Sequence, residues 1–220
     1  MNLSSDTLSV LKNFSDINQN LLIKPGNKVQ TISTMKNILA EAEVSEMFES
    51  EFAIYDLPEF LRSVELFDKP ELKFNGGGYV NISKGNSRGI KYFFADKSVI
   101  VSPSKGINMP DKHVTFTLKK DDFTDLMKGA TTLNLPDISV VGKGGNISIV
   151  ATDKKNKSSN TYSVNVGETD KEFTAYFRTE NFKQIVDDYD VAISKAKISH
   201  FVNRNKAVQY WIALEPDSEF

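Results

Sequence analysis

The sequence contains no cysteine, only two histidines and no long apolar run. The absence of cysteine excludes disulfides, thiolate metal sites and cysteine nucleophiles. No apolar run approaches the roughly 20 residues that a membrane-spanning helix needs. The N-terminal residues MNLSSDTLSV lack the basic and apolar regions of a signal peptide. These absences predict a cytosolic protein that is not secreted and has no membrane partner.

The chain also lacks an excess of positive charge. Its 27 lysines and arginines face 29 aspartates and glutamates, so the formal net charge is −2. The sequence pI is about 5.8. Proteins that hold nucleic acid by bulk electrostatics are usually basic. A nucleic-acid function would therefore need a means of retention other than net charge.

Residues that commonly carry catalysis are few and poorly spaced. His113 and His200 each lie in a strand-like segment, without the paired spacing of a zinc site. The neighbouring carboxylates Asp121-Asp122 and Asp187-Asp188 would diverge by about 100° on a helix instead of converging on one substrate. Surface and helix-start carboxylates are the better explanation for both pairs.

The glycine-rich and polar loops also lack the marks of a ligand site. Gly76-Gly77-Gly78 and Gly144-Gly145 have neither the lysine nor the serine or threonine of a phosphate loop, and they are typical of hairpin turns. The loop DKKNKSSN at 153–160 has basic residues where a calcium loop needs acids. We predict a protein that is not an enzyme and that has no catalytic residue, metal or cofactor.

What the sequence does contain is one unit repeated four times. Each copy has an acidic or capping start followed by an apolar pair three residues apart, and the copies recur at near-equal intervals. This spacing is typical of an amphipathic helix. The predicted helices are 4–14, 57–67, 120–130 and 179–189, with Ser4 or Ser5 as the N-cap of the first.

Short strand-like segments with turn residues between them follow each predicted helix. Each unit is therefore strand-helix-strand-strand-strand, and the fold class is α+β. Four units make two similar domains, 1–96 and 113–220, each with two helices on one side of antiparallel sheet. Residues 97–112 contain two prolines, a glycine and no periodicity, as expected of an interdomain connector.

Each predicted helix carries a cation away from its apolar face. On a helical wheel Lys12 lies nearly opposite Val10 and Phe14. An exposed lysine on a helix is usually only a solvated residue, and Asp125 and Glu180 share these polar faces. The outward cations are Lys12, Arg62, Lys128 and Lys183.

The repeat, the connector and the two ends of the chain together resemble the sliding clamps of DNA replication, the proliferating-cell-nuclear-antigen-like family of processivity factors. Within that family the chain is most similar to the clamps of T-even-type bacteriophages. The most specific segments are LKNFSDIN at 11–18, AIYDL at 53–57 and IALEPDS at 212–218.

The resemblance implies a homotrimer in which six domains of the DNA clamp fold form a ring, with helices facing duplex DNA. A ring held on DNA by topology needs few phosphate contacts, and those contacts carry no sequence information. Topology would thus supply the retention on DNA that the net charge of the chain does not. Lys12, Arg62, Lys128 and Lys183 are then the expected DNA-facing residues.

The resemblance also implies two protein-binding surfaces. Subunits would join by pairing the strand at 90–95 with the strand at 161–166 of the next chain. The expected interface residues are Ile90, Tyr92, Phe94, Tyr162, Val164 and Val166. Partner peptides would bind an apolar pocket formed by the connector, the chain end and a loop of the first domain. The expected pocket residues are Met35, Val99, Val101, Ile107, Met109, Pro110, Ala213, Leu214 and Pro216.

The implied partners are duplex DNA, a replicative DNA polymerase and an ATP-driven clamp loader, with late-transcription factors in some relatives. The implied location is the cytoplasm of the phage-infected host cell. Two other hypotheses stay open at this point. The chain could be a monomeric β-rich interaction module, or an enzyme with a pocket between duplicated domains.

Overall fold

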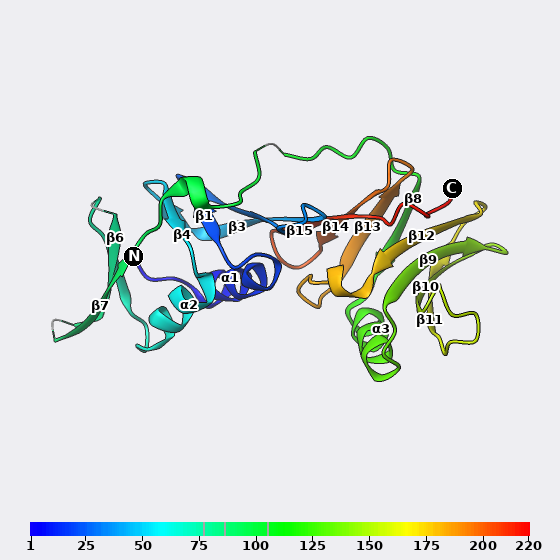
Figure 1. Ribbon diagram of the computed structural model, residues 1–220, viewed down its shortest axis with the longest axis horizontal. Helices are drawn as coiled ribbons and strands as arrows, with labels where there is room; N and C mark the ends of the chain where they lie inside the picture. The colour runs from blue at the N-terminus through cyan, green and yellow to red at the C-terminus, as the bar shows by residue number, and fades with distance from the viewer. Residues whose placement is uncertain (77, 86, 105) are drawn as a thin grey trace. The chain divides into compact units, whose positions relative to one another are not determined.

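The computed structural model describes residues 1–76, 78–85, 87–104 and 106–220 (Figure 1). The chain divides into two compact units, Met1–Gly106 and Ile107–Phe220. The division falls inside the segment 97–112 that the sequence marks as a connector. Gly77, the middle residue of the predicted glycine turn, lies outside the described residues.

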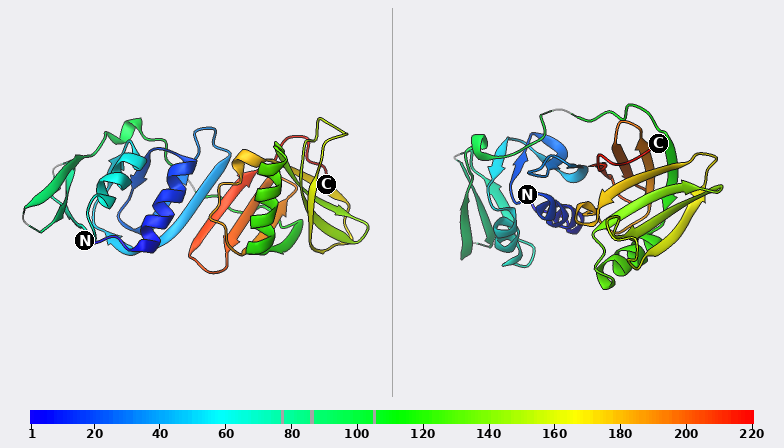
Figure 2. Two further views of the ribbon diagram at one scale, coloured as in Figure 1. Left: turned by 90° about the horizontal axis from the view of Figure 1, so that it is seen from below. Right: turned by 45° about the vertical axis from the view of Figure 1, so that its right-hand side comes forward.

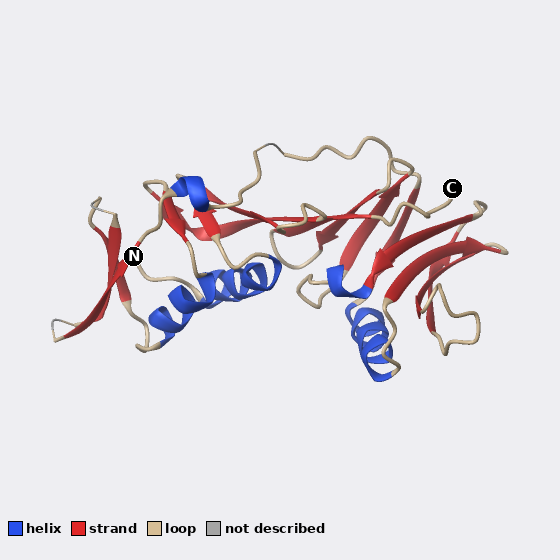
Figure 3. Ribbon diagram, in the orientation of Figure 1, coloured by secondary structure: helices blue, strands red, loops and turns tan. Residues whose placement is uncertain are grey.

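The described residues of unit 1 form two α-helices and three small groups of antiparallel strands (Figure 3). The pairings are β1 with β4, β2 with β3, and β5–β6–β7 in that order. The elements are α1 Ser5–Ile17, β1 Leu21–Ile23, β2 Gly26–Ile32, β3 Ile38–Phe48, β4 Phe52–Ile54, α2 Leu57–Glu65, β5 Glu71–Phe74, β6 Tyr79–Lys84, β7 Arg88–Phe93 and the 3₁₀ turn Lys97–Val99.

Three strands follow α1 as predicted, but they do not all pair in chain order. β2 and β3 form a hairpin, but β1 pairs with β4 instead of β2. Pro25 has no N–H to donate, and Gly26 has a φ of 115°, so the chain bends away between β1 and β2.

Unit 2 holds one α-helix and two groups of antiparallel strands. One sheet has the order β11–β10–β9–β12, and β8, β13, β14 and β15 pair in the order β15–β14–β13–β8. The elements are β8 Val114–Leu118, α3 Lys120–Thr132, β9 Asp137–Lys143, β10 Asn146–Thr152, β11 Tyr162–Glu168, β12 Phe173–Arg178, the 3₁₀ turn Thr179–Asn181, β13 Tyr189–Ser194, β14 Ile198–Asn203 and β15 Val208–Ala213.

The turn between β9 and β10 follows the prediction. Gly144 and Gly145 have φ values of 58° and 85°. Two consecutive positive φ angles are typical of a type I′ hairpin turn, where glycine is favoured.

The predicted fourth helix at 179–189 is wrong. Only Thr179–Asn181 form a 3₁₀ turn, and Tyr189 already belongs to β13. The segment is rich in Asn, Thr, Val, Asp and aromatic residues, which are weaker helix formers. Its aspartates bond elsewhere: the Asp188 carboxylate accepts from the Lys120 N–H at 2.7 Å, and that of Asp187 accepts from the Asn205 amide at 2.6 Å. Unit 2 therefore has one α-helix where two were predicted.

Side-chain caps explain where the helices of unit 1 begin. Ser4 caps α1 by accepting a hydrogen bond from the Thr7 N–H at 3.1 Å, as predicted. Asp56 caps α2 by accepting from the Glu59 N–H at 2.7 Å, with Pro58 in the first turn. α1 and α2 lie side by side (Figure 2). The sequence thus starts both helices through ordinary capping chemistry.

A buried carboxylate reinforces the start of α1. Glu46 of β3 accepts hydrogen bonds from the Ser4 N–H and the Thr7 hydroxyl. Burial by itself would raise the pKa of Glu46, but these hydrogen bonds outweigh it and hold the pKa below its usual value. Glu46 therefore stabilises unit 1 as the anion.

We expect Glu46→Gln to lower the free energy of unfolding by about 1–3 kcal/mol at neutral pH, because a hydrogen-bonded carboxylate is lost. The folded pKa lies below the unfolded value, so this stabilisation is present above the unfolded pKa of about 4.3. It is lost as the pH falls through the folded pKa. Urea unfolding of wild type and variant at several pH values measures it. A difference that stays constant into strong acid would contradict the role given to Glu46.

Candidate nucleic-acid interface and partner surfaces

The outward face of the unit 1 helices carries the cations that the sequence predicted. α1 buries Val10, Leu11, Phe14 and Ile17, which leaves Lys12 exposed. Arg62 is exposed on α2, away from the buried residues Leu57, Phe60, Leu61 and Val64. The Lys12 ammonium forms an ion pair with Glu65 of α2, and both side chains are about half exposed. A pair of this kind contributes little stability.

In unit 2 Lys128 is exposed on a helix, as the sequence predicts, whereas Lys183 is not on a helix. Lys128 is exposed on α3, with its ammonium 3.7 Å from the Asp125 carboxylate. Lys183 is half-buried and lies on the irregular segment after the 3₁₀ turn, not on a helix. Its backbone N–H donates to the Asn181 carbonyl at 3.0 Å.

Acids outnumber bases on the three α-helices. The cations are Lys12, Arg62, Lys120 and Lys128, and the acids are Asp6, Asp16, Glu59, Glu65, Asp121, Asp122 and Asp125. A surface with this balance does not bind phosphates tightly by charge alone.

Sequence reasoning missed a basic group in unit 2 that we call the α3 basic cluster. The N-terminus of α3, the segment 179–188 and the turn after β14 are tied together by hydrogen bonds. Asp188 bonds the Lys120 N–H through its carboxylate and the Arg204 N–H through its carbonyl. The cluster consists of Lys119, Lys120, Lys183, Arg204 and Lys206. Three acids, Asp187, Asp188 and Asp190, lie in or next to the same segments, and Arg204 pairs with Asp190 at 3.7 Å. These residues lie far apart in the sequence, so no local pattern could reveal them.

The strands predicted to join subunits are both at sheet edges. Within the described residues, β7 has β6 as its one strand neighbour, and β11 has β10. The opposite edges of the same sheets are covered by the chain ends. Met1 exchanges hydrogen bonds with Leu72 of β5 at 3.0 and 2.7 Å. Glu219 exchanges them with Thr174 of β12 at 2.8 and 2.9 Å. Each sheet thus has one protected edge and one open edge.

The predicted interface residues of β7 are half-buried on the side of α2. The Tyr92 hydroxyl donates to the Asp56 carbonyl at 3.1 Å, and its ring packs on Phe60. Burial raises the pKa of Tyr92 to about 12. Phe94 stacks on Phe52, and Ile90 is half-buried on β7. These side chains hold β7 onto unit 1 and leave its backbone edge open.

The predicted residues of β11 are half-buried against α3. A Cβ at Gly129 would lie 2.6 Å from Tyr162 Cγ, so glycine is needed for this close approach. Val164 pairs with Ile149 in register, but Val166 falls at a β-bulge between Asn165 and Gly167. Bulges interrupt regular pairing. Val166 therefore marks the end of the regular edge.

Unit 1 holds three of the predicted pocket residues, and hydrogen bonds join two of the segments that carry them. The Asn18 amide donates to the Ile32 carbonyl at 2.8 Å and to the Val101 carbonyl at 3.3 Å. This ties the segment 99–101 to the end of β2, just before the turn that carries Met35. Met35, Val99 and Val101 are exposed by 81, 53 and 36%. All three are exposed apolar side chains of unit 1.

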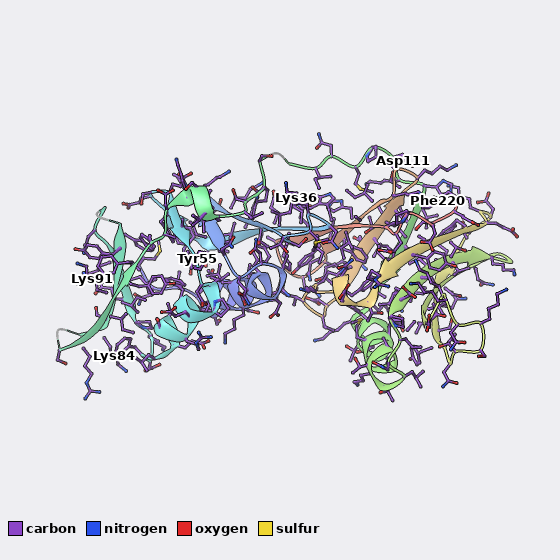
Figure 4. All side chains as sticks on the ribbon, viewed as in Figure 1. Lys36, Tyr55, Lys84, Lys91, Asp111 and Phe220 are labelled. Carbon is purple, nitrogen blue, oxygen red and sulfur yellow. The ribbon has the colours of Figure 1, made fainter. Side chains whose placement is uncertain are left out.

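The pocket residues of unit 2 are less uniform. Ile107, Met109 and Ala213 are half-buried, and Pro110 and Pro216 are exposed. Leu214 is buried, with 7% of its surface exposed, and its N–H donates to the Lys197 carbonyl at 2.9 Å. Leu214 therefore belongs to the core and offers little surface to a peptide. The Asp111 carboxylate accepts a hydrogen bond from the Ser194 hydroxyl, which anchors the segment 107–110 (Figure 4).

Both histidines make ordinary contacts within the fold of unit 2. Burial and the nearby Lys195 and Lys171 lower the pKa of His113. His200 stacks on Trp211 at 4.5 Å and bonds Gln209. The described residues contain no group of three or more His, Cys, Asp or Glu that could hold a metal ion. None of their helices is long and apolar enough to cross a membrane.

Solved structures of other proteins share this architecture. The chain aligns with the proliferating cell nuclear antigen of Thermococcus kodakaraensis at a TM-score of 0.71, covering 98% of this chain and 99% of the other at 14% identity. The Entamoeba histolytica protein gives 0.67, covering 94% of each chain at 15% identity. These values confirm the predicted α+β clamp fold.

Sequence comparison extends this to the family. The sliding clamp of Vibrio phage KVP40 is 34% identical over 98% of this chain and 99% of its own length. The chain belongs to the sliding-clamp family. The clamp of Enterobacteria phage T4 is 31% identical over 99% of this chain and 98% of its own. The family described as DNA polymerase processivity factor matches residues 4–102, and the one described as gp45 sliding clamp, C terminal, matches 115–216. The resemblance to T-even-type phage clamps is confirmed.

Proposed function

We propose that this clamp forms a homotrimeric ring around duplex DNA and tethers a replicative DNA polymerase without contributing catalysis. The full-length similarity to phage sliding clamps supports the polymerase role. The observation that carries the ring is the pair of open edges, β7 and β11, one in each unit. An open edge is an aggregation liability unless another strand covers it. A neighbouring copy of the chain can cover both.

The sparse positive charge fits a ring that slides. Lys12, Arg62 and Lys128, together with the α3 basic cluster, would make weak, sequence-independent phosphate contacts. The acidic excess on the helices prevents tight binding, and topology would keep the ring on DNA. An ATP-driven loader would be needed to open and close such a ring. The clamp would act in the cytoplasm of the infected host cell.

Retention on closed DNA tests this function. The protein, a clamp loader and ATP are incubated with nicked circular DNA and with the same DNA linearised, and the bound clamp is separated by gel filtration. Loader-dependent retention on circles, lost on linear DNA, is the expected result. Equal retention on both forms would show binding by contacts alone and would contradict the encircling ring.

The exposed apolar residues Met35, Val99 and Val101 of unit 1 are the proposed docking residues for partner peptides, with Ile107, Met109, Pro110, Ala213 and Pro216 of unit 2 as further candidates. A few exposed apolar anchors beside a connector at 97–112, between domains 1–96 and 113–220, suit peptide capture. Polymerase, loader and late-transcription factors would compete for it.

We expect Met35→Asp to weaken polymerase binding by about tenfold or more, because a charge replaces an apolar anchor. Loading onto circular DNA should fall as well, because the loader is proposed to dock at the same site. Surface plasmon resonance with the polymerase measures the first quantity. Met47→Asp is the matched control, since Met47 is a 62% exposed methionine on β3. Equal losses for both variants would remove the docking role of Met35.

A further inference from the structure

The open edge of β7 carries charges of opposite sign at its two ends. Arg88 is exposed at its start, and Lys84 of β6, its register partner, is also exposed. The Lys84 ammonium is 3.2 Å from the Asp68 carboxylate, which partly offsets its charge. Just beyond the end of β7, Asp96 is exposed and near the ion pair of Glu51 and Lys97. Lys91 is also exposed in the middle of β7, with its ammonium over the Tyr79 ring. The edge is therefore positive along the strand and negative beyond its end.

The open edge of β11 also has opposite charges at its ends. The loop before it exposes Lys155 and Lys157. After it the chain exposes the acids Glu168, Asp170 and Glu172. The nearby cations there are Lys171, whose ammonium donates to the His113 carbonyl at 2.5 Å, and Lys143 on β9. This edge also runs from positive to negative.

We propose that the charges at these four strand ends select an antiparallel junction between β7 of one copy and β11 of the next, and hold it closed. The inference rests on the proposed ring. In antiparallel pairing Arg88 lies at the end that carries Glu168 and Asp170, and Asp96 lies at the end that carries Lys155 and Lys157. In parallel pairing like charges would meet at both ends, which is unfavourable.

The shortness of the junction makes these charges important. β7 has six residues, and the bulge at Val166 leaves only the start of β11 as a regular edge. Half-buried Tyr92 and Val164 offer modest apolar area. Because this junction has few backbone hydrogen bonds and little apolar contact, a substantial share of the affinity between copies comes from the charged residues. Exposed charges are screened over about 8 Å at physiological salt, so ring closure becomes salt-dependent.

Charge reversal tests the proposal. Wild type, Arg88→Glu, Glu168→Lys and the double variant are compared by light scattering over a dilution series, at low and high salt. Lys24→Glu is the matched control, since Lys24 is exposed between β1 and β2. At low salt each single reversal should raise the concentration of half-dissociation about three- to tenfold. The double variant should return toward wild type, and high salt should weaken wild type and shrink these differences.

The outcomes separate this proposal from the ring itself. A trimeric wild type whose singles match the Lys24→Glu control, or whose double variant is weaker than either single, overturns the charge-selected junction and leaves the ring intact. A wild type that is monomeric at every concentration overturns the ring first. Because the double variant carries both substitutions, its recovery also shows that neither prevents folding.

Discussion

Lys91→Pro is expected to turn the ring into monomers. Phe94 donates its N–H to the Gly78 carbonyl at 2.8 Å, which is the inner side of β7. Backbone groups alternate along a strand, so the N–H of Lys91 points to the open edge. Proline removes that donor and places a ring where the next strand would pair. The partner carbonyl is then left without its hydrogen bond, at a cost of about 1–3 kcal/mol. The trimer should weaken by about one to two orders of magnitude.

The matched control is Lys91→Ala, which removes the charge and its contact with the Tyr79 ring but keeps the N–H. Sedimentation velocity of the three proteins gives the distribution of species directly. Thermal unfolding should remain similar, because proline is tolerated at a strand edge. A stable Lys91→Pro trimer would mean that β7 does not join copies.

Phe123→Ala is expected to produce the largest loss of stability, about 3–5 kcal/mol, because it leaves a cavity in a packed core. Phe123 of α3 is 1% exposed and packs edge-on against Phe182 and Tyr189 at 6.2 Å. Phe182 comes from the segment that replaces the predicted fourth helix. The loss should therefore also loosen the α3 basic cluster.

Urea unfolding followed by circular dichroism measures this loss. Phe93→Ala is the control, since Phe93 is 65% exposed on β7 and should cost far less. Similar losses for the two variants would mean that Phe123 is not a core anchor of unit 2.

The sequence predicted the three α-helices because local signals determine them. Ser4 and Asp56 are side-chain caps, and the apolar pairs of α1, α2 and α3 face the core. The same pattern failed at 179–189. There Phe182 is buried by contacts with Phe123, Phe177 and Phe201, and tertiary bonds of Asp187 and Asp188 fix the backbone in an irregular path. Periodicity alone cannot distinguish a helix from a packed irregular segment.

The candidate surfaces could be predicted only in part. Lys12, Arg62 and Lys128 were found because a helical wheel places them outward. The α3 basic cluster depends on tertiary hydrogen bonds, such as the one between Lys120 and Asp188, 68 residues apart, which no local pattern encodes. Leu214 was predicted to line the partner pocket, but it directly follows β15 and its side chain is buried in the core. Which edges the chain ends cover also follows from tertiary structure alone.

The central claim is that open edges on β7 and β11 close a ring of three chains. Multi-angle light scattering over a dilution series tests it most directly. One chain has a mass of 24.6 kDa. The ring predicts a species of three chains at high concentration that dissociates to monomer on dilution. A monomer at every concentration would contradict the ring and remove the topological explanation of how an acidic protein stays on DNA.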